Sequence, residues 1–225
     1  MNRWGMFLKA LFYYVLSSTA QPMANNYNEM LLEINKTRSN FYAAYENASS
    51  MQKDSVIASA RTYLLSKITS DIFPQWYGTP WDFYGTTRIP GQGKIACGYF
   101  VTTVLQDAGF NIPRNEWAKL PSEVFIRKLS PDAHRFSSKT MGEIKRYFLR
   151  SSDGLYLAGL DNHVGFVWVQ NNEIKFIHSN YYQPEIGVMS QDIDSDNPFF
   201  RSNYRVIGKL FSDEMIIKWI SNSVF

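Results

Sequence analysis

Cys97 is the only cysteine among the 225 residues of the chain. It cannot form a disulfide within the chain, and one cysteine cannot build a thiolate metal site. It is therefore either a small buried residue, the commoner role of a free cysteine, or a nucleophile. The turn-rich segment 88–96 precedes it, and a helix is predicted over 97–109. Free amides and the helix dipole at a helix N-terminus stabilise a thiolate, which favours a nucleophile with a lowered pKa.

A cysteine nucleophile needs a base and a third group that orients the base. The chain has three histidines that could serve. His134 lies in a polar segment without periodicity, so we expect it at the surface. His163 and His178 lie in segments 163–169 and 173–178, which are rich in β-branched and aromatic residues and are predicted to be strands.

Asn171-Asn172 between these strands predicts a two-residue hairpin turn. In that register His163 faces Asn180, and Gly165 faces His178. Side chains alternate between the faces of a sheet, so both histidines and Asn180 share one face, with the histidines as diagonal neighbours. An odd-length loop or a bulge would change this register. Gly165 leaves room on this face for a ligand or for the helix of Cys97. The opposite face is apolar: Val164, Phe166 and Trp168.

The order of the predicted elements, helices first and antiparallel strands later, is that of an α+β protein. Two helices are expected within residues 26–69, the second with Asp54 or Ser55 as its N-cap, and Pro74 is expected to end that run. A loop rich in glycine and proline follows over 75–96. Further helices are predicted over 141–149 and 215–220, and further strands over 155–160 and 204–210.

The N-terminus is predicted to be a secretory signal peptide, residues 1–20. Two positive charges precede an apolar core at 10–16 and small residues at 18–20. The alternative is an amphipathic first helix of a cytoplasmic protein. The segment is too short for a convincing membrane span, so none is expected in the mature chain. The predicted division is therefore a signal peptide over 1–20, a helical extension over 21–74 and one domain over 75–225.

Composition narrows the classes of partner. Hydrophobic residues make up 45% of the chain and aromatic residues 16%, enough for a large core. The net charge of +3 is mild and no basic stripe is present, so nucleic acid is not an expected partner. A pI near 8.8 is compatible with an anionic partner such as a cell-wall polymer.

Five segments together resemble the NlpC-type cell-wall cysteine peptidases. Segments 96–101 and 108–114 are similar to the family's Asp-Cys-Ser-Gly helix start and its Gly-Ile-x-Leu-Pro-Arg ending. Segments 163–166 and 176–179 are similar to its His-Val-Gly-Ile and Phe-Ile-His-Ala strands. Segment 81–85 is similar to its Tyr-x-Tyr-Gly-Gly. The resemblance covers roughly residues 75–180, and three motifs follow one another in the family's order.

The chain departs from the family pattern at three positions. Ala96 and Gly98 stand where the family has Asp and Ser, and Trp81 stands where it has a tyrosine. Tyr84 is the nearby residue that could offer a hydroxyl.

The resemblance implies a papain-like fold and hydrolysis of an amide bond, in particular in peptidoglycan stem peptides. Cys97 would be the nucleophile, His163 its imidazolium partner and His178 the residue that orients His163. Residues expected to contact the substrate are Trp81, Tyr84, Gly98 and Asn180. The chemistry requires no metal and no cofactor, and it would take place in the periplasm or outside the cell.

Other functions stay open at this point. In CHAP amidases the third group is often Asn or Glu, for which Asn180 is available. A transglutaminase-like transferase would want an Asp near 178–180, where none occurs. A non-enzymatic exported module could hold peptide or glycan in the same cleft, and a secreted toxin would use the same chemistry in another role. The oligomeric state is not predicted.

Overall fold

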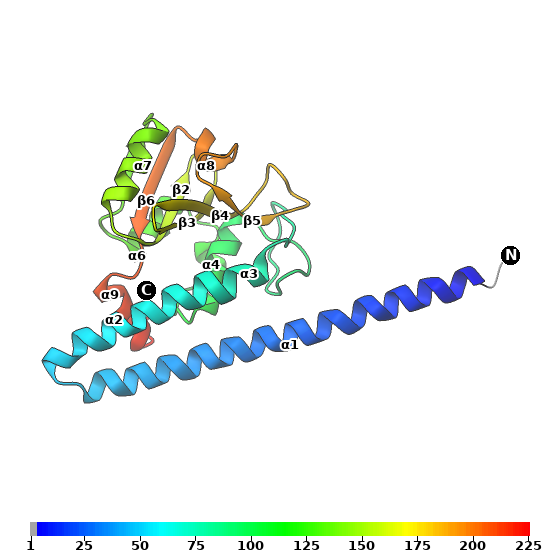
Figure 1. Ribbon diagram of the computed structural model, residues 1–225, viewed down its shortest axis with the longest axis horizontal. Helices are drawn as coiled ribbons and strands as arrows, with labels where there is room; N and C mark the ends of the chain where they lie inside the picture. Colours follow the sequence, from blue (N-terminus) through cyan, green and yellow to red (C-terminus); the bar gives the residue numbers. More distant parts are fainter. Residues whose placement is uncertain (1–3) are drawn as a thin grey trace.

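The computed structural model describes the backbone of residues 4–225 and the side chains from residue 26 onward. The predicted signal peptide, residues 1–20, lies outside the described side chains. The chain combines helices with one six-stranded antiparallel sheet, which confirms the expected α+β class. The strand order is β1-β6-β2-β3-β4-β5, and Figure 1 labels all of these strands except β1.

The helices come mainly from the first half of the chain and the strands from the second. The helical elements are α1 (Trp4–Asn47), α2 (Ser50–Ser66), a π-helical turn (Lys67–Ile72), α3 (Phe73–Trp76), α4 (Cys97–Asp107), α5 (Arg114–Trp117), α6 (Ser122–Leu129), α7 (Met141–Arg150), α8 (Pro198–Arg201) and α9 (Asp213–Ile220). The strands are β1 (His134–Ser137), β2 (Gly154–Leu160), β3 (Val164–Gln170), β4 (Glu173–Ser179), β5 (Val188–Asp192) and β6 (Tyr204–Lys209).

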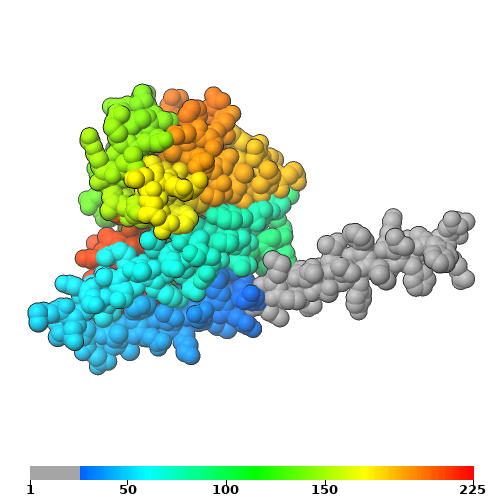
Figure 2. Space-filling model, in the orientation of Figure 1, coloured from blue at the N-terminus to red at the C-terminus, as the bar shows by residue number. Residues whose placement is uncertain are grey.

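Both faces of the sheet are covered by helices, so each face has its own apolar core. On one face Phe166 and Ile177 pack against α3 and α4, and α1, α2 and α9 continue that core. On the other face Val167 and Phe176 pack with Phe148 of α7 and Phe199 of α8. Figure 2 shows α2 and the described part of α1 as a ridge along one side of the sheet domain. Buried Ile34 and Leu64 join these two helices to the larger core.

The helical segments differ from the prediction at two points. The expected N-cap of α2 at Asp54 or Ser55 is wrong: Ser49 caps the helix, and the Gln52 side chain accepts a hydrogen bond from the Ser49 amide. Pro74 does not end the helical run, which continues through α3 to Trp76. The π-helical turn before it changes the hydrogen-bond spacing, and Pro74 then occupies a first-turn position that needs no amide.

The strands predicted over 155–160, 163–169, 173–178 and 204–210 are present to within one or two residues. Strands β1 and β5 and the short helices α5, α6 and α8 were not expected. In the part of the chain that the structure describes, no helix is both long enough and apolar enough to cross a membrane.

Candidate active site

Cys97 is the first residue of α4, as predicted, and the chain before it is held at three points. Ala96 is the extended N-cap of the helix, and its amide donates to the carbonyl of Gly85 at 2.9 Å. The amide of Ile95 donates to the carbonyl of Pro80 at 2.9 Å. The buried hydroxyl of Ser179, at the end of β4, donates to the carbonyl of Ile95 at 2.7 Å. These bonds fix the start of α4 against the end of the histidine hairpin.

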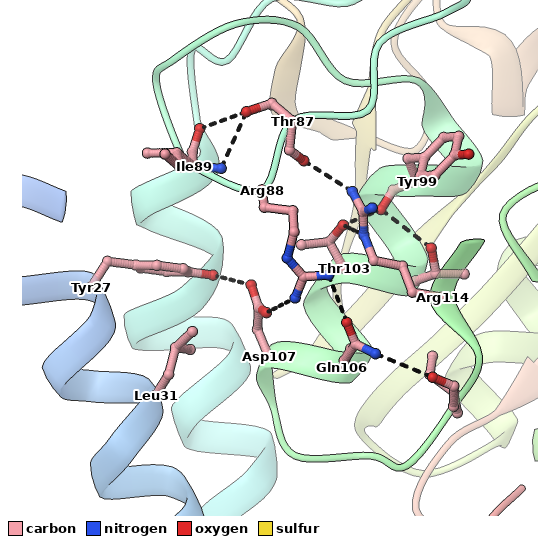
Figure 3. Close-up of polar contacts among 12 residues, drawn as sticks. Tyr27, Leu31, Thr87, Arg88, Ile89, Tyr99, Thr103, Gln106, Asp107 and Arg114 are labelled. Atoms are coloured by element: carbon pink, nitrogen blue, oxygen red, sulfur yellow. Dashed lines mark hydrogen bonds and ion pairs between the residues drawn. The ribbon is translucent and has the colours of Figure 1, made fainter.

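Two arginines fasten the loop 85–95 to α4 (Figure 3). The buried Arg114 donates to the carbonyls of Thr86 and Thr87 at 3.0 Å each and to the Thr103 hydroxyl at 2.7 Å. Arg88 donates to Gln106 at 2.8 Å and lies 3.7 Å from the carboxylate of Asp107.

Asp107, the last residue of α4, connects α1 to the C-terminal end of that helix. It accepts a hydrogen bond of 2.7 Å from the Tyr27 hydroxyl, which itself accepts one of 2.9 Å from Trp76 Nε1. Figure 3 shows Tyr27 of α1 and Arg88 of the loop meeting at this carboxylate. Burial raises the pKa of Asp107 to about 6.

The hairpin register is the one predicted from the sequence. Strands β3 and β4 pair Phe166 with Ile177 and Gln170 with Glu173, and the turn consists of Asn171-Asn172. Both asparagines have positive φ, 51° and 67°, as a type I′ turn requires.

This register brings the two histidines into contact. Nε2 of His163 lies 2.9 Å from Nδ1 of His178, and both side chains are buried. Nε2 of His178 lies in turn 2.9 Å from Oε1 of Gln191, on the edge strand β5. His178, and not Asn180, is therefore the partner of His163.

The surroundings of the hairpin differ from the prediction. The histidine face was expected to be open beside Gly165, but a Cβ at that position would lie 2.6 Å from the ring of Phe176. The Phe176 ring therefore fills the space that we expected for a ligand or for the cysteine helix. Helix α4 packs instead on the opposite, apolar face, where Phe100 contacts Phe166 edge-on at 6.0 Å between ring centroids.

Cys97 and His163 nevertheless line one cavity, at the junction of α4, α6 and the start of β3. Its volume is about 380 Å³. Gly98 and Val164 line it beside them, and Glu123 and Tyr204 are also among its lining residues. Interactions with the backbone of Val164, Gly98 and Cys97 itself favour the negatively charged form of the sulfur.

The electrostatics correct the expectation of a lowered thiol pKa. Burial raises the pKa of the Cys97 thiol, and the interactions with the backbone offset this only in part. Burial and the neighbouring His178 hold the pKa of His163 well below its usual value. Burial lowers the pKa of His178 to about 4. At neutral pH the site therefore holds a thiol and two neutral imidazoles, and neither the thiolate expected from the helix N-terminus nor the imidazolium implied by the resemblance.

One ring nitrogen of the histidine pair is available to react. Among the described residues, Nδ1 of His163 is buried and has no hydrogen-bond partner. A buried polar atom without a partner costs about 1–3 kcal/mol and usually marks a place where a ligand, a water molecule or a reacting group belongs.

The four residues predicted to contact the substrate lie in different environments. Gly98 lines the cavity, and its departure from the family's Ser has a steric reason: a Cβ would lie 2.3 Å from the carbonyl oxygen of Ala118. Asn180 is buried and holds its own loop, since its Oδ1 accepts from the Tyr182 amide at 2.9 Å and its Nδ2 points to Met189. Its side chain leaves no oxygen directed at His163, which removes the support for a CHAP-type third group.

The two aromatic candidates, Trp81 and Tyr84, lie in different environments. Trp81 packs on Tyr181 with 6.0 Å between ring centroids, and Tyr181 packs on His163 at 5.2 Å. Tyr84 is 84% exposed, contacts Phe83 and does not line the cavity of Cys97. Its role in binding stays a prediction.

Two residues of the site were missed. The ring of Tyr181 packs on His163, its hydroxyl donates to Asn162 at 3.3 Å, and burial raises its pKa to about 12. Gln191 extends the histidine pair. The dipeptide Tyr181-Tyr182, directly after strand β4, was a usable signal for Tyr181. Nothing in the pattern of 188–192 predicts the role of Gln191.

His134 is exposed, as predicted, although it lies on the edge strand β1 and not in a loop. It lines a larger hollow of about 970 Å³ together with Arg61 and Lys209, apart from Cys97. Within the described residues, no group of three or more His, Cys, Asp or Glu side chains is placed to hold a metal ion.

No protein-family model, no curated protein and no solved structure matches this chain.

Proposed function

We propose that the protein is a cysteine hydrolase that cleaves an amide bond, with Cys97 as nucleophile and His163 as general base. The observation that carries the proposal is the junction of Cys97 with the paired histidines. A thiol at a helix start shares a cavity with an imidazole whose Nδ1 has no hydrogen-bond partner among the described residues. Nucleophile, base and orienting group are the three parts that acyl transfer needs.

The protonation states of Cys97 and His163 define the order of the proton transfers in the proposed reaction. The Cys97 sulfur attacks the amide carbonyl carbon as Nδ1 of His163 takes the thiol proton, because both groups are neutral beforehand. The imidazolium then gives this proton to the departing amine, the C–N bond breaks and a thioester remains on Cys97. Water, deprotonated by His163, attacks the thioester and releases a carboxylate and the free thiol.

The developing oxyanion needs donors. We assign this role to backbone amides at the start of α4, and removal of one such donor typically costs about 3 kcal/mol of transition-state stabilisation. The burial of His178 and its contact with His163 support its role in orienting the base.

For the substrate we propose the stem peptides of peptidoglycan, and for the fold a divergent papain-like core of the NlpC type. The support is the set of sequence motifs together with a helix that begins at a cysteine and packs on an antiparallel sheet with two neighbouring histidine strands. Export of the mature chain follows from the same proposal, since this substrate lies outside the cytoplasm.

A non-catalytic binding module is the second candidate, because burial raises the pKa of the Cys97 thiol and keeps it protonated. Incubation with purified peptidoglycan, followed by mass spectrometry of released fragments, separates the two. We expect amide cleavage by the wild type, none by Cys97→Ala and a loss of about 10²–10⁴-fold for His163→Ala. His134→Ala, an exposed histidine, is the matched control and should keep full activity. Cleavage by Cys97→Ala, or binding of the fragments without cleavage by the wild type, would refute the hydrolase.

A further inference from the structure

Gln191 is a half-buried residue beside the histidine pair, and the proposed reaction gives it no role. It projects from the edge strand β5, whose register with β4 pairs Phe176 with Gln191 and His178 with Met189. Gln191 is therefore diagonal to His178 on the same face, and its Oε1 lies 2.9 Å from Nε2 of that histidine. Within the described chain it is the group at the outer nitrogen of the histidine pair.

The chemistry of an amide oxygen fixes where protons lie along this chain of contacts. A carbonyl oxygen only accepts hydrogen bonds, so the facing Nε2 of His178 must bear a hydrogen. A neutral imidazole has one N–H, which leaves Nδ1 of His178 bare. The 2.9 Å contact from that nitrogen to His163 then needs a donor, so Nε2 of His163 bears the hydrogen. Nδ1 of His163 is the bare nitrogen, and it is also the one without a partner.

The reverse orientation of the amide would reverse every bond in the series. The Gln191 nitrogen would donate to His178, His178 would donate to His163, and Nδ1 of His163 would bear an N–H. That N–H would be a buried donor without a partner, in the cavity that His163 shares with the Cys97 thiol. In that orientation His163 would offer the thiol proton no acceptor.

We propose that Gln191 is a positioning residue that sets the tautomers of His178 and His163, so that Nδ1 of His163 is bare and ready to accept a proton. The tautomers follow from the contacts, from the orientation of the Gln191 amide and from the neutrality of both rings. Only the identity of the proton donor, the Cys97 thiol, rests on the proposed function. Both imidazoles are neutral at pH 7 because burial lowers their pKa values, so a single hydrogen on each ring is the state that Gln191 selects.

The test is long-range ¹H–¹⁵N NMR of the protein labelled at histidine, which distinguishes bare from protonated ring nitrogens. In the wild type at pH 7, we expect bare Nδ1 and protonated Nε2 in both rings. Gln191→Glu keeps an oxygen that can accept from Nε2 of His178 and should keep these tautomers. Gln191→Leu removes the acceptor and should give a mixture in which Nδ1 of His163 is partly protonated. Gln170→Leu, the same change at an exposed position on β3, is the control and should leave both rings unchanged.

The second readout is the rate at which iodoacetamide alkylates Cys97 at pH 7, which needs no natural substrate. Loss of one positioning hydrogen bond should slow it about tenfold in Gln191→Leu, with recovery in Gln191→Glu. A protonated Nδ1 on His163 in the wild type, or unchanged tautomers in Gln191→Leu, would overturn the proposal. If Gln191→Leu does not fold, the wild-type and Gln191→Glu spectra still decide. Correct tautomers without amide hydrolysis would uphold Gln191 and refute the hydrolase instead.

Discussion

Gly98→Ala is the substitution whose outcome the geometry constrains most tightly. A Cβ at Gly98 would lie 2.3 Å from the carbonyl oxygen of Ala118, whereas ordinary van der Waals contacts begin at 3.4 Å. The obstacle is backbone and cannot turn away, and the Ala118 amide is itself bonded to the carbonyl of Arg114 at 2.9 Å. Relief therefore needs a backbone shift of about 1 Å, and such overpacking costs about 2–3 kcal/mol, the upper part of the usual range.

The same substitution also brings a gain, since alanine is favoured over glycine in a helix by about 1 kcal/mol. The expected net loss of unfolding free energy is therefore about 1–2 kcal/mol. Gly142→Ala provides a matched control, because Gly142 is likewise the second residue of its helix, α7, and is exposed. A Cβ there would meet its nearest neighbour, Nη1 of Arg146, at 3.6 Å, so only the gain of up to about 1 kcal/mol applies.

Urea unfolding followed by circular dichroism measures both variants against the wild type. We expect Gly98→Ala to have the lower midpoint and Gly142→Ala the higher, with free energies of unfolding about 2–3 kcal/mol apart. Equal or greater stability of Gly98→Ala would refute the close approach of α4 to Ala118. It would also remove the steric reason for glycine where the resembling family has serine.

Three further predictions concern pH and the turn. The pKa of Asp107, raised from 3.8 to about 6, means that the folded state holds its proton more tightly, so this stabilisation is present below pH 4 and is lost as the pH rises through 6. Asp107→Asn should not lose this stabilisation, so its free energy of unfolding should rise by up to about 3 kcal/mol relative to that of the wild type between pH 4 and 7.5. If urea unfolding shows the same difference between variant and wild type at both pH values, the burial argument is contradicted. Asn172→Val should cost about 1–2 kcal/mol because φ is 67°, whereas Asn172→Gly should not destabilise; equal midpoints for the two would argue against the type I′ turn. In the proposed hydrolase, kcat/KM should stay level from pH 7.5 down to 6, because the lowered pKa of His163 keeps it neutral, and an acid limb at or above 6.5 would contradict this.

The hairpin was predictable because its local rules leave little freedom. Two asparagines between two alternating segments fix both the turn and the register, and the register fixes which residues are diagonal. The contact between His163 and His178 follows from these rules without knowledge of the rest of the chain. The helix start at Cys97 was predictable for a similar reason, since glycine and proline punctuation marks it in the sequence.

The side of the sheet that α4 covers was not predictable in this way. Together α7, α8 and β5 bury the histidine face, so α4 packs on the other face. Of these elements, α8 and β5 are short and have weak sequence patterns. The thiol pKa was mispredicted because the helix terminus is a local feature, while the burial that outweighs it is a property of the whole fold. Gln191 and Tyr181 escaped notice because strand β5 and the segment 180–187 show no period that would place their side chains.

The central claim, that Cys97 attacks an amide carbonyl, is tested most directly by the mass of the intact protein during digestion of peptidoglycan fragments, with samples quenched in acid. The mechanism predicts a transient adduct of one acyl group, attached to Cys97 as a thioester and absent from Cys97→Ala. Release of cleaved fragments by the Cys97→Ala variant, at the wild-type rate and with no adduct on the wild-type protein, would contradict it.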